Sequence, residues 1–269
     1  ALWRVGRADG DDLVVRLPRT LGAEASILTE FELLPALGRT ALASAVVLPA
    51  LVHRGDPTER FPLHWAMTTW IDGDDAWTAR NRLDRHQRRL ALDLAGVVGL
   101  IGSLDGLAAP ERPSGARGGP LGPLLDRLDR WLDDPEWSAD SLVDSVAIRR
   151  SAAQSAEVID EPVDIGFVHG DLIPGNVLTV DGRLAAIIDW GGAGYGDAAQ
   201  DLTPAWAILA GEGRAIFRTS RDVDEASWLR ARAFALEQAV GGVLYYVPRR
   251  HPLGDVMART LTRILTGAS

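Results

Sequence analysis

The feature that most constrains this chain is a short hairpin with polar residues at its open end. Two apolar runs, Val177–Val180 and Leu184–Ile188, flank an Asp-Gly pair at 181–182. Asp-Gly between two such runs is a strong signal for a two-residue hairpin turn. Pairing of the runs brings Asn176 and Asp189 near each other. One carboxylate and one amide oxygen, with room for water and substrate, are ligands that suit Mg²⁺.

A third polar residue precedes this hairpin. The run Ile165–His169 is predicted to be a strand, and Asp171 follows it in a loop that Gly170, Pro174 and Gly175 interrupt. Loops at strand ends are where reactive groups are displayed. A carboxylate beside a metal ion can accept the proton of a hydroxyl group. The pattern therefore predicts a general base next to a magnesium site.

The rest of the chain divides into a strand-rich front and a helix-rich back. Strands are predicted at 2–6, 12–17, 46–52 and 65–71, with an Asp9-Gly10 hairpin turn and one helix over 24–37. After Asp72-Gly73 the apolar spacing becomes helical. Helices are predicted at 84–104, 124–134, 141–158, 198–218, 226–247 and 254–266, and the Gly/Pro-rich stretch 105–123 is predicted to be a loop.

Composition excludes several classes of function. The 269 residues carry 37 acidic and 28 basic side chains, a net charge of −9, which argues against a non-specific nucleic-acid binder. Cysteine is absent, so disulfides, thiolate metal sites and cysteine nucleophiles are excluded. Lysine is also absent, which excludes Schiff-base chemistry. No apolar run could span a bilayer and no signal peptide is visible, so we expect a cytoplasmic protein with no membrane partner.

Three motifs together resemble those of the aminoglycoside phosphotransferase and choline kinase-like family. H-G-D-x-x-x-x-N stands at 169–176, I-D-W at 188–190 and G-D-x-x-x-D-L at 196–202. Each is weak alone, but their order over some 34 residues is specific. The related protein-kinase pattern H-R-D-L-x-x-x-N followed by D-F-G differs here at two positions, where Gly170 and Trp190 stand.

The resemblance implies an α+β, two-lobed protein kinase-like fold. A small antiparallel-sheet N-lobe would cover 1–71, and a larger, mostly helical C-lobe with the catalytic loop, metal site and substrate pocket would cover 72–269. The implied reaction moves the γ-phosphate of ATP or GTP to a hydroxyl of a small molecule with Mg²⁺. The expected substrate is an antibiotic, so that the reaction would confer resistance. We expect a monomer or a homodimer.

The resemblance also assigns roles to residues of the C-lobe. Asp171 would be the catalytic base, and Asn176 and Asp189 would hold Mg²⁺. Structural support of the site would come from His169, Asp197 and Asp201.

The nucleotide would lie against the N-lobe. Arg16 takes the position of the family's lysine that contacts the α- and β-phosphates, with Glu30 as its ion-pair partner and Glu24 as the alternative. Backbone groups of the strip Thr68, Thr69, Trp70 and Ile71 would meet the purine. The loop that should cover the phosphates is thin, because residues 1–10 contain only two glycines. Since the chain also starts at Ala1 without methionine, the N-lobe is compatible with a truncated N-terminus.

The substrate itself is open. Aminoglycosides, macrolides and basic peptides all fit, and acidic residues could attract a polycation. Candidate substrate residues are Asp74, Asp75, Trp77 and Trp131. Alternative functions are a kinase of an ordinary amino alcohol or sugar, and a non-catalytic kinase-like nucleotide-binding protein. Dinucleotide binding is disfavoured, because the glycine run 191–196 does not match G-x-G-x-x-G. Zinc and serine hydrolase motifs are absent.

Overall fold

The computed structural model describes residues 1–8 and 10–267. The predicted Asp9-Gly10 turn includes a residue outside these ranges. Within them, no helix is both long and apolar enough to cross a membrane.

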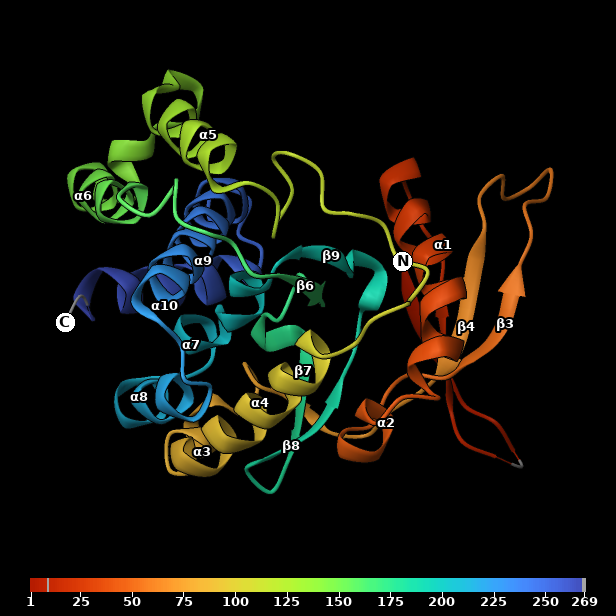
Figure 1. Cartoon of the computed structure of the whole chain (residues 1–269). Coiled ribbons are helices and arrows are strands. Elements are labelled where there is room, and N and C mark those ends of the chain that lie inside the picture. The colour runs from red at the N-terminus through yellow and green to blue at the C-terminus, as the bar shows by residue number, and fades with distance from the viewer. Residues whose placement is uncertain (9, 268–269) are drawn as a thin grey trace.

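The N-terminal part is a four-stranded antiparallel sheet with one long helix. The strand order is β1-β2-β4-β3, formed by Leu2–Val5, Leu13–Arg16, Trp65–Thr69 and Leu51–Gly55. Helix α1 (Leu21–Leu37) begins at Thr20, whose hydroxyl accepts the N–H of Ala23 at 3.2 Å. Its apolar face buries Ile27 and Phe31 against Ala66 of β4. Figure 1 shows α1 beside the sheet, and Leu33, Leu34 and Leu37 of this helix join the large core of the C-terminal part.

The predicted strand at 46–52 is wrong in its first half. Residues Leu42–Ala45 form α2, and Val46 is buried in the large core of the C-terminal part. Val47 instead joins the central hairpin, because its N–H donates to the Ala185 carbonyl at 3.0 Å and its carbonyl accepts from Ile187 at 3.2 Å. The segment that leads into β3 of the front sheet is therefore bonded to β8, the strand that precedes Asp189.

The C-terminal part packs helices around two small sheets (Figure 1). Strands β5 (Asp74–Asp75), β7 (Val177–Val180) and β8 (Arg183–Ile187) form one sheet, and β6 (Ile165–Val168) pairs with β9 (Gly194–Asp197). The helices are α3 (Arg80–Leu83), α4 (Gln87–Gly102), α5 (Leu121–Asp133), α6 (Ser145–Ala156), α7 (Pro204–Ala207), α8 (Gly211–Ser220), α9 (Glu225–Tyr246) and α10 (Leu253–Thr266). The expected α+β class is confirmed.

Two local predictions need correction. Strand β9 was not expected, since its glycine-rich sequence has low strand propensity; it forms because it pairs with β6, with Phe167 opposite Tyr195. The predicted helix 198–218 is split into a 3₁₀ helix (Ala198–Leu202), α7 and α8. Pro204 starts α7, and Gly211, with a φ of +46°, starts α8 in a backbone conformation that favours glycine.

We predict that Asp224 contributes measurably to the stability of the central helix α9. Its carboxylate accepts the N–H of Ser227 at 2.8 Å, and hydrogen bonds from Ser227 lower the pKa of Asp224 below its ordinary 3.8. Asp224→Ala should lower the free energy of unfolding by about 1 kcal/mol at pH 7, and Asp224→Ser should retain most of it. A depressed pKa means that this stabilisation is present above pH 3.8 and is lost as the pH falls through the folded-state value. Urea denaturation at pH 7, and at a pH below the folded-state pKa of Asp224, measures the two unfolding free energies. Equal stability of Asp224→Ala and wild type at pH 7 would contradict the prediction.

Candidate active site

Asp171 lies in a loop that the buried carboxylate of Asp201 holds in place. Asp201 accepts the backbone N–H of His169 at 2.6 Å and that of Gly170 at 2.9 Å, one on each oxygen. Burial raises the pKa of Asp201. Gly170 has a φ of +80°, and a Cβ there would lie 2.8 Å from the carbonyl of Gly192. The turn therefore requires glycine at position 170. The N–H groups of His169 and Gly170 both have an acceptor.

His169 links the same loop to the end of β8. Its Nδ1 accepts the N–H of Asp171 at 3.2 Å, so the proton lies on Nε2, which donates to the Ile188 carbonyl at 3.1 Å. The ring is buried and packs edge-on against Trp190, with centroids 4.6 Å apart. With both nitrogens engaged by backbone groups, His169 positions the loop.

The structure brings Asn176 and Asp189 to one place, as the hairpin pattern predicts. The N–H of Ile188 donates to the Asn176 carbonyl at 3.0 Å and closes the hairpin. The Asn176 side-chain nitrogen donates to the Asp171 carbonyl at 2.9 Å and to its carboxylate at 3.2 Å. That orientation leaves the amide oxygen of Asn176 free of these two bonds. Asn176 and Asp189 line the same cavity as Asp171, so they could hold a metal ion there.

An ion-pair network connects this cavity to the front sheet. The Arg16 guanidinium binds Glu30 and also Asp189, the latter at 2.9 Å. The other oxygen of Glu30 accepts the N–H of Trp190 at 2.9 Å. Glu30 is only 1% exposed, and burial raises its pKa while the charge of Arg16 opposes that rise. The alternative residue Glu24 binds His64 instead, at 2.8 Å.

The cavity next to Asp171 has a volume of about 670 Å³, and four aromatic side chains form part of its wall. Its rings come from α5, from the 3₁₀ helix after it and from α9, namely Trp131, Trp137, Tyr245 and Tyr246. The charged pair Arg127–Glu237 also lines it, with Nε to carboxylate 2.8 Å. Burial raises the pKa of Glu237.

Two residues that contact Asp171 were missed by the sequence analysis. Arg117, from the loop between α4 and α5, forms an ion pair with the Asp171 carboxylate. Gln238 of α9 donates to the same oxygen at 3.0 Å. Arg112 holds this loop in place, because its Nε donates to the Arg117 carbonyl at 2.6 Å and its Nη1 to the Gly192 carbonyl. The Gly/Pro-rich loop carried no motif, and Gln238 lies in an ordinary helical pattern, so neither had a signal.

Three of the four candidate substrate residues do not line this cavity. Asp74 forms an ion pair with Arg82, and Asp75 accepts the N–H groups of Trp77 and Thr78, both at 3.0 Å. The Trp77 ring lies 4.3 Å from the guanidinium of Arg80. Local partners therefore engage all three side chains, and only Trp131 lines the cavity.

The remaining predicted residues do not line this cavity. Asp197 accepts the N–H of Ala199 at 2.9 Å and forms an ion pair with buried Arg230 at 3.0 Å. Burial raises the pKa of Asp197. In the strip that starts in β4, Thr68 is buried, the N–H of Thr69 donates to the Ala50 carbonyl at 3.0 Å, and that of Trp70 to the Asp12 carbonyl at 2.9 Å; Ile71 follows directly.

Comparison with known proteins identifies the family. The model of the phosphotransferase enzyme family matches residues 2–237. The chain belongs to this family. The predicted family and the prediction of a phosphotransferase enzyme are thereby confirmed. No curated protein sequence matches the chain.

Solved structures of this family share the fold at low sequence identity. The GDP and kanamycin complex of APH(2")-IIia is 17% identical, with a TM-score of 0.70 over 100% of this chain and 94% of that one. A thermostable mutant of the aminoglycoside phosphotransferase APH(4)-Ia, in a ternary complex with AMP-PNP and hygromycin B, is 18% identical, with a TM-score of 0.57 over 100% and 95%. The macrolide 2'-phosphotransferase MphH from Brachybacterium faecium is 18% identical, with a TM-score of 0.59 over 97% and 88%. The kinase-like fold is thus confirmed.

We predict that the loop carrying Asp171 depends on Asp201 for stability. Asp201→Ala leaves the N–H groups of His169 and Gly170 without their acceptors in the interior, which should cost about 3 kcal/mol of unfolding free energy. Asp201→Asn keeps one acceptor oxygen and should cost less. Guanidinium denaturation followed by circular dichroism measures the difference. Wild-type stability of Asp201→Ala would show that the two N–H groups find other partners.

Proposed function

We propose that this phosphotransferase moves the γ-phosphate of ATP or GTP to a hydroxyl of a small-molecule antibiotic. The observation that carries the proposal is the convergence of Asp171, Asn176 and Asp189 on one cavity, with the Arg16–Glu30 pair at its sheet side. Solved members of the fold that bind GDP with kanamycin, or AMP-PNP with hygromycin B, support the same reaction class.

Asp171 is the base in this reaction. The substrate hydroxyl oxygen forms a bond to the γ-phosphorus, the bond from that phosphorus to the β-γ bridging oxygen breaks, and the hydroxyl proton passes to the Asp171 carboxylate. The transition state of such a transfer is loose, so orientation of the hydroxyl matters more than its activation. The hydrogen bonds from Asn176 and Gln238 hold the carboxylate in one orientation for this task.

The donor set suits a magnesium ion. Asn176 offers an amide oxygen and Asp189 a carboxylate. Residues 1–8 and 10–267 contain no group of three or more acidic or histidine side chains that could hold a metal ion by themselves. Mg²⁺ is commonly bound by one or two protein oxygens and completes its six ligands with phosphate oxygens and water. When bound, the ion neutralises phosphate charge.

The nucleotide lies between the sheet and the metal residues in this proposal. Glu30 orients the Arg16 guanidinium, which then contacts the phosphates, and the backbone of Thr68–Ile71 meets the purine. We place the boundary between the nucleotide-binding part, 1–71, and the catalytic part, 72–269, directly after this strip.

The cavity wall favours a substrate with a broad apolar or ring-shaped face, of which macrolides are the nearest antibiotic class. Its four aromatic rings supply such a surface. Its charged side chains are already paired, as in Arg127–Glu237. The acidic side chains Asp129 and Asp133 of α5 bind Arg149 on the exposed side of that helix. They therefore give little support to attraction of a polycation.

The decisive test is phosphate transfer to a panel of macrolides, aminoglycosides, basic peptides, amino alcohols and sugars with ATP or GTP and Mg²⁺. Mass spectrometry should show a gain of about 80 Da, one phosphoryl group, on a macrolide. Asp171→Asn should lower kcat by roughly 10²- to 10⁴-fold. Asp181→Asn, the same change at the exposed hairpin turn, should leave it unaltered.

Two outcomes would contradict this function. Nucleotide-dependent thermal stabilisation without transfer to any compound would favour a non-catalytic nucleotide-binding protein. Unchanged turnover in Asp171→Asn would remove this residue from its role as base.

We predict that Arg117 competes with the substrate for Asp171. The guanidinium binds the carboxylate that must accept the hydroxyl proton, so it has to move before the hydroxyl arrives. Arg117→Ala should lower KM by roughly two- to fivefold, as expected for loss of a half-exposed ion pair, with kcat nearly unchanged. Steady-state kinetics separates the two constants, with exposed Arg150→Ala as the control. A large fall in kcat at unchanged KM would instead place Arg117 on the transferring phosphate.

A further inference from the structure

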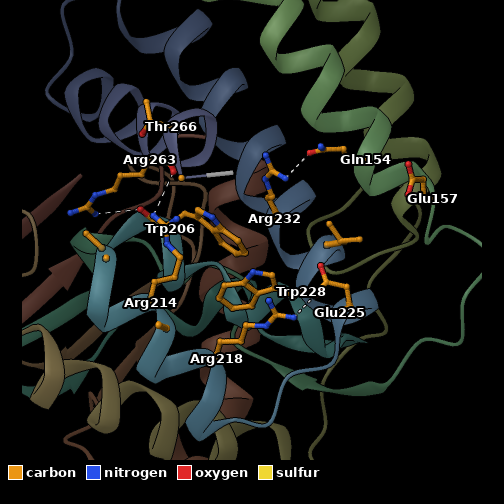
Figure 2. Close-up of a pocket in the computed structure, with 15 residues that line it drawn as sticks. Gln154, Glu157, Trp206, Arg214, Arg218, Glu225, Trp228, Arg232, Arg263 and Thr266 are labelled. Atoms are coloured by element: carbon orange, nitrogen blue, oxygen red, sulfur yellow. Dashed lines mark hydrogen bonds and ion pairs between the residues drawn. The ribbon is translucent and has the colours of Figure 1, made fainter. Parts of the chain in front are cut away.

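A second and larger cavity lies among the C-terminal helices. It has a volume of about 840 Å³ and shares no lining residue with the candidate active site. Residues of α6, α7, α8, α9 and α10 form its walls, and four arginines face it, namely Arg214, Arg218, Arg232 and Arg263 (Figure 2). Among the residues that the structure describes, two acidic side chains line it, those of Glu157 and Glu225. Since the protein as a whole is acidic, this local excess of positive charge stands out.

Three of these arginines, Arg214, Arg232 and Arg263, form no ion pair with a carboxylate in the described part of the chain. Arg232 is 9% exposed, and its Nη1 donates to the side-chain oxygen of Gln154 at 2.9 Å. Arg214 donates through Nε to the Ala205 carbonyl at 3.0 Å. Arg218, in contrast, is paired with Glu225. Arg263 donates through Nη1 to the Ile208 carbonyl at 3.1 Å. These bonds to neutral oxygens orient the three guanidinium groups but leave their charges uncompensated.

The positive charges that line this cavity disfavour one another. Burial lowers the pKa of Arg214, and the nearby charge of Arg232 lowers it further. Burial also lowers the pKa of Arg232 and brings that of Arg263 to about 10. All remain charged at neutral pH, so partly desolvated like charges lie together, which costs free energy. An anion between them would relieve that cost.

Other features of the wall suit the same kind of ligand. Helix α8 starts at the cavity with Gly211, and no side chain caps its first turn. The free N–H groups of such a helix end favour negative charge. The rings of Trp206 and Trp228 lie 4.6 Å apart in the wall, and Trp206 is buried (Figure 2). The cavity therefore combines several cationic side chains with an apolar surface.

We propose that this cavity is a binding site for a small multivalent oxyanion, a carboxylate or a phosphate, held between Arg214 and Arg232. Guanidinium groups bind carboxylate and phosphate oxygens through paired N–H donors, so either head group satisfies the chemistry. A volume of about 840 Å³ is typical of small-molecule sites, so the cavity has room for an oxyanion of the size of citrate or pyrophosphate. The site is independent of the phosphotransfer reaction proposed above.

The test is a titration of the full chain with pyrophosphate and, separately, with citrate, each against sodium chloride of equal ionic strength. Isothermal calorimetry should show saturable binding of at least one oxyanion and none of chloride. Arg232→Gln should weaken binding roughly 10- to 100-fold, the loss expected for a charge-assisted contact, and Arg232→Lys should restore part of it. Arg150→Gln, the same change at an exposed position of α6, should bind like wild type. Binding of pyrophosphate would identify a phosphate head group, and binding of citrate would identify a carboxylate head group.

A second variant tests the cavity without removing an arginine. Ala215 is exposed and lines the cavity. Ala215→Glu introduces a carboxylate that competes with the ligand, so binding should be lost, whereas Ala215→Gln should retain it. This pair remains informative if Arg232→Gln does not fold.

Pyrophosphate could also bind at the candidate nucleotide site, so Arg16→Gln is measured in parallel. Binding that survives Arg16→Gln but not Ala215→Glu supports the proposal. Binding that is lost in Arg16→Gln and unchanged in Arg232→Gln and Ala215→Glu would place the anion in the active site and overturn it, as would absence of saturable binding by both oxyanions.

Discussion

The site depends on one buried carboxylate, Glu30. Its two oxygens bind Arg16 of the sheet and the N–H of Trp190, so α1 connects the front sheet to the segment that carries Asp189. A buried carboxylate is costly unless charge and hydrogen bonds compensate it, and breaking such a pair from one side leaves an uncompensated charge. The pairing thus ties the position of the sheet to that of Asp189 and Trp190. Any displacement of α1 would move Arg16 relative to Asp189.

The loop that carries Asp171 is held in place mainly by Asp201 and His169, which have no chemical step in the proposed reaction. Asp201 binds two backbone N–H groups from below, and His169 joins the loop to β8 through both ring nitrogens. Asp189 itself has a φ of +66°, a conformation that non-glycine residues rarely adopt. The surrounding hydrogen bonds and the closed hairpin sustain that conformation. Local strain of this kind is characteristic of functional sites.

Helix α9 connects the two cavities of the C-terminal part. Near its N-terminus, Trp228 and Arg232 line the arginine-rich cavity that is proposed to bind an oxyanion. Further along the helix, Gln238 and Tyr245 line the cavity that contains Asp171. The helix is buried over most of its 22 residues, which explains why its sequence lacks a clear polar face. A rigid, buried helix can therefore present chemically different walls at its two ends. The Asp224 cap at its start contributes to the position of both.

The sequence by itself determined the hairpin, the order of the three motifs and the α+β class, because these depend on short-range spacing and turn chemistry. It also predicted the meeting of Asn176 and Asp189, which only two strands separate. Tertiary structure alone decided the contacts of Asp171 with Arg117 and Gln238, 54 and 67 residues away, and the local engagement of Asp74 and Asp75. It likewise decided the grouping of arginines from α8, α9 and α10 around one cavity. The path of a glycine-rich loop and the packing of helices depend on long-range contacts that no local pattern encodes.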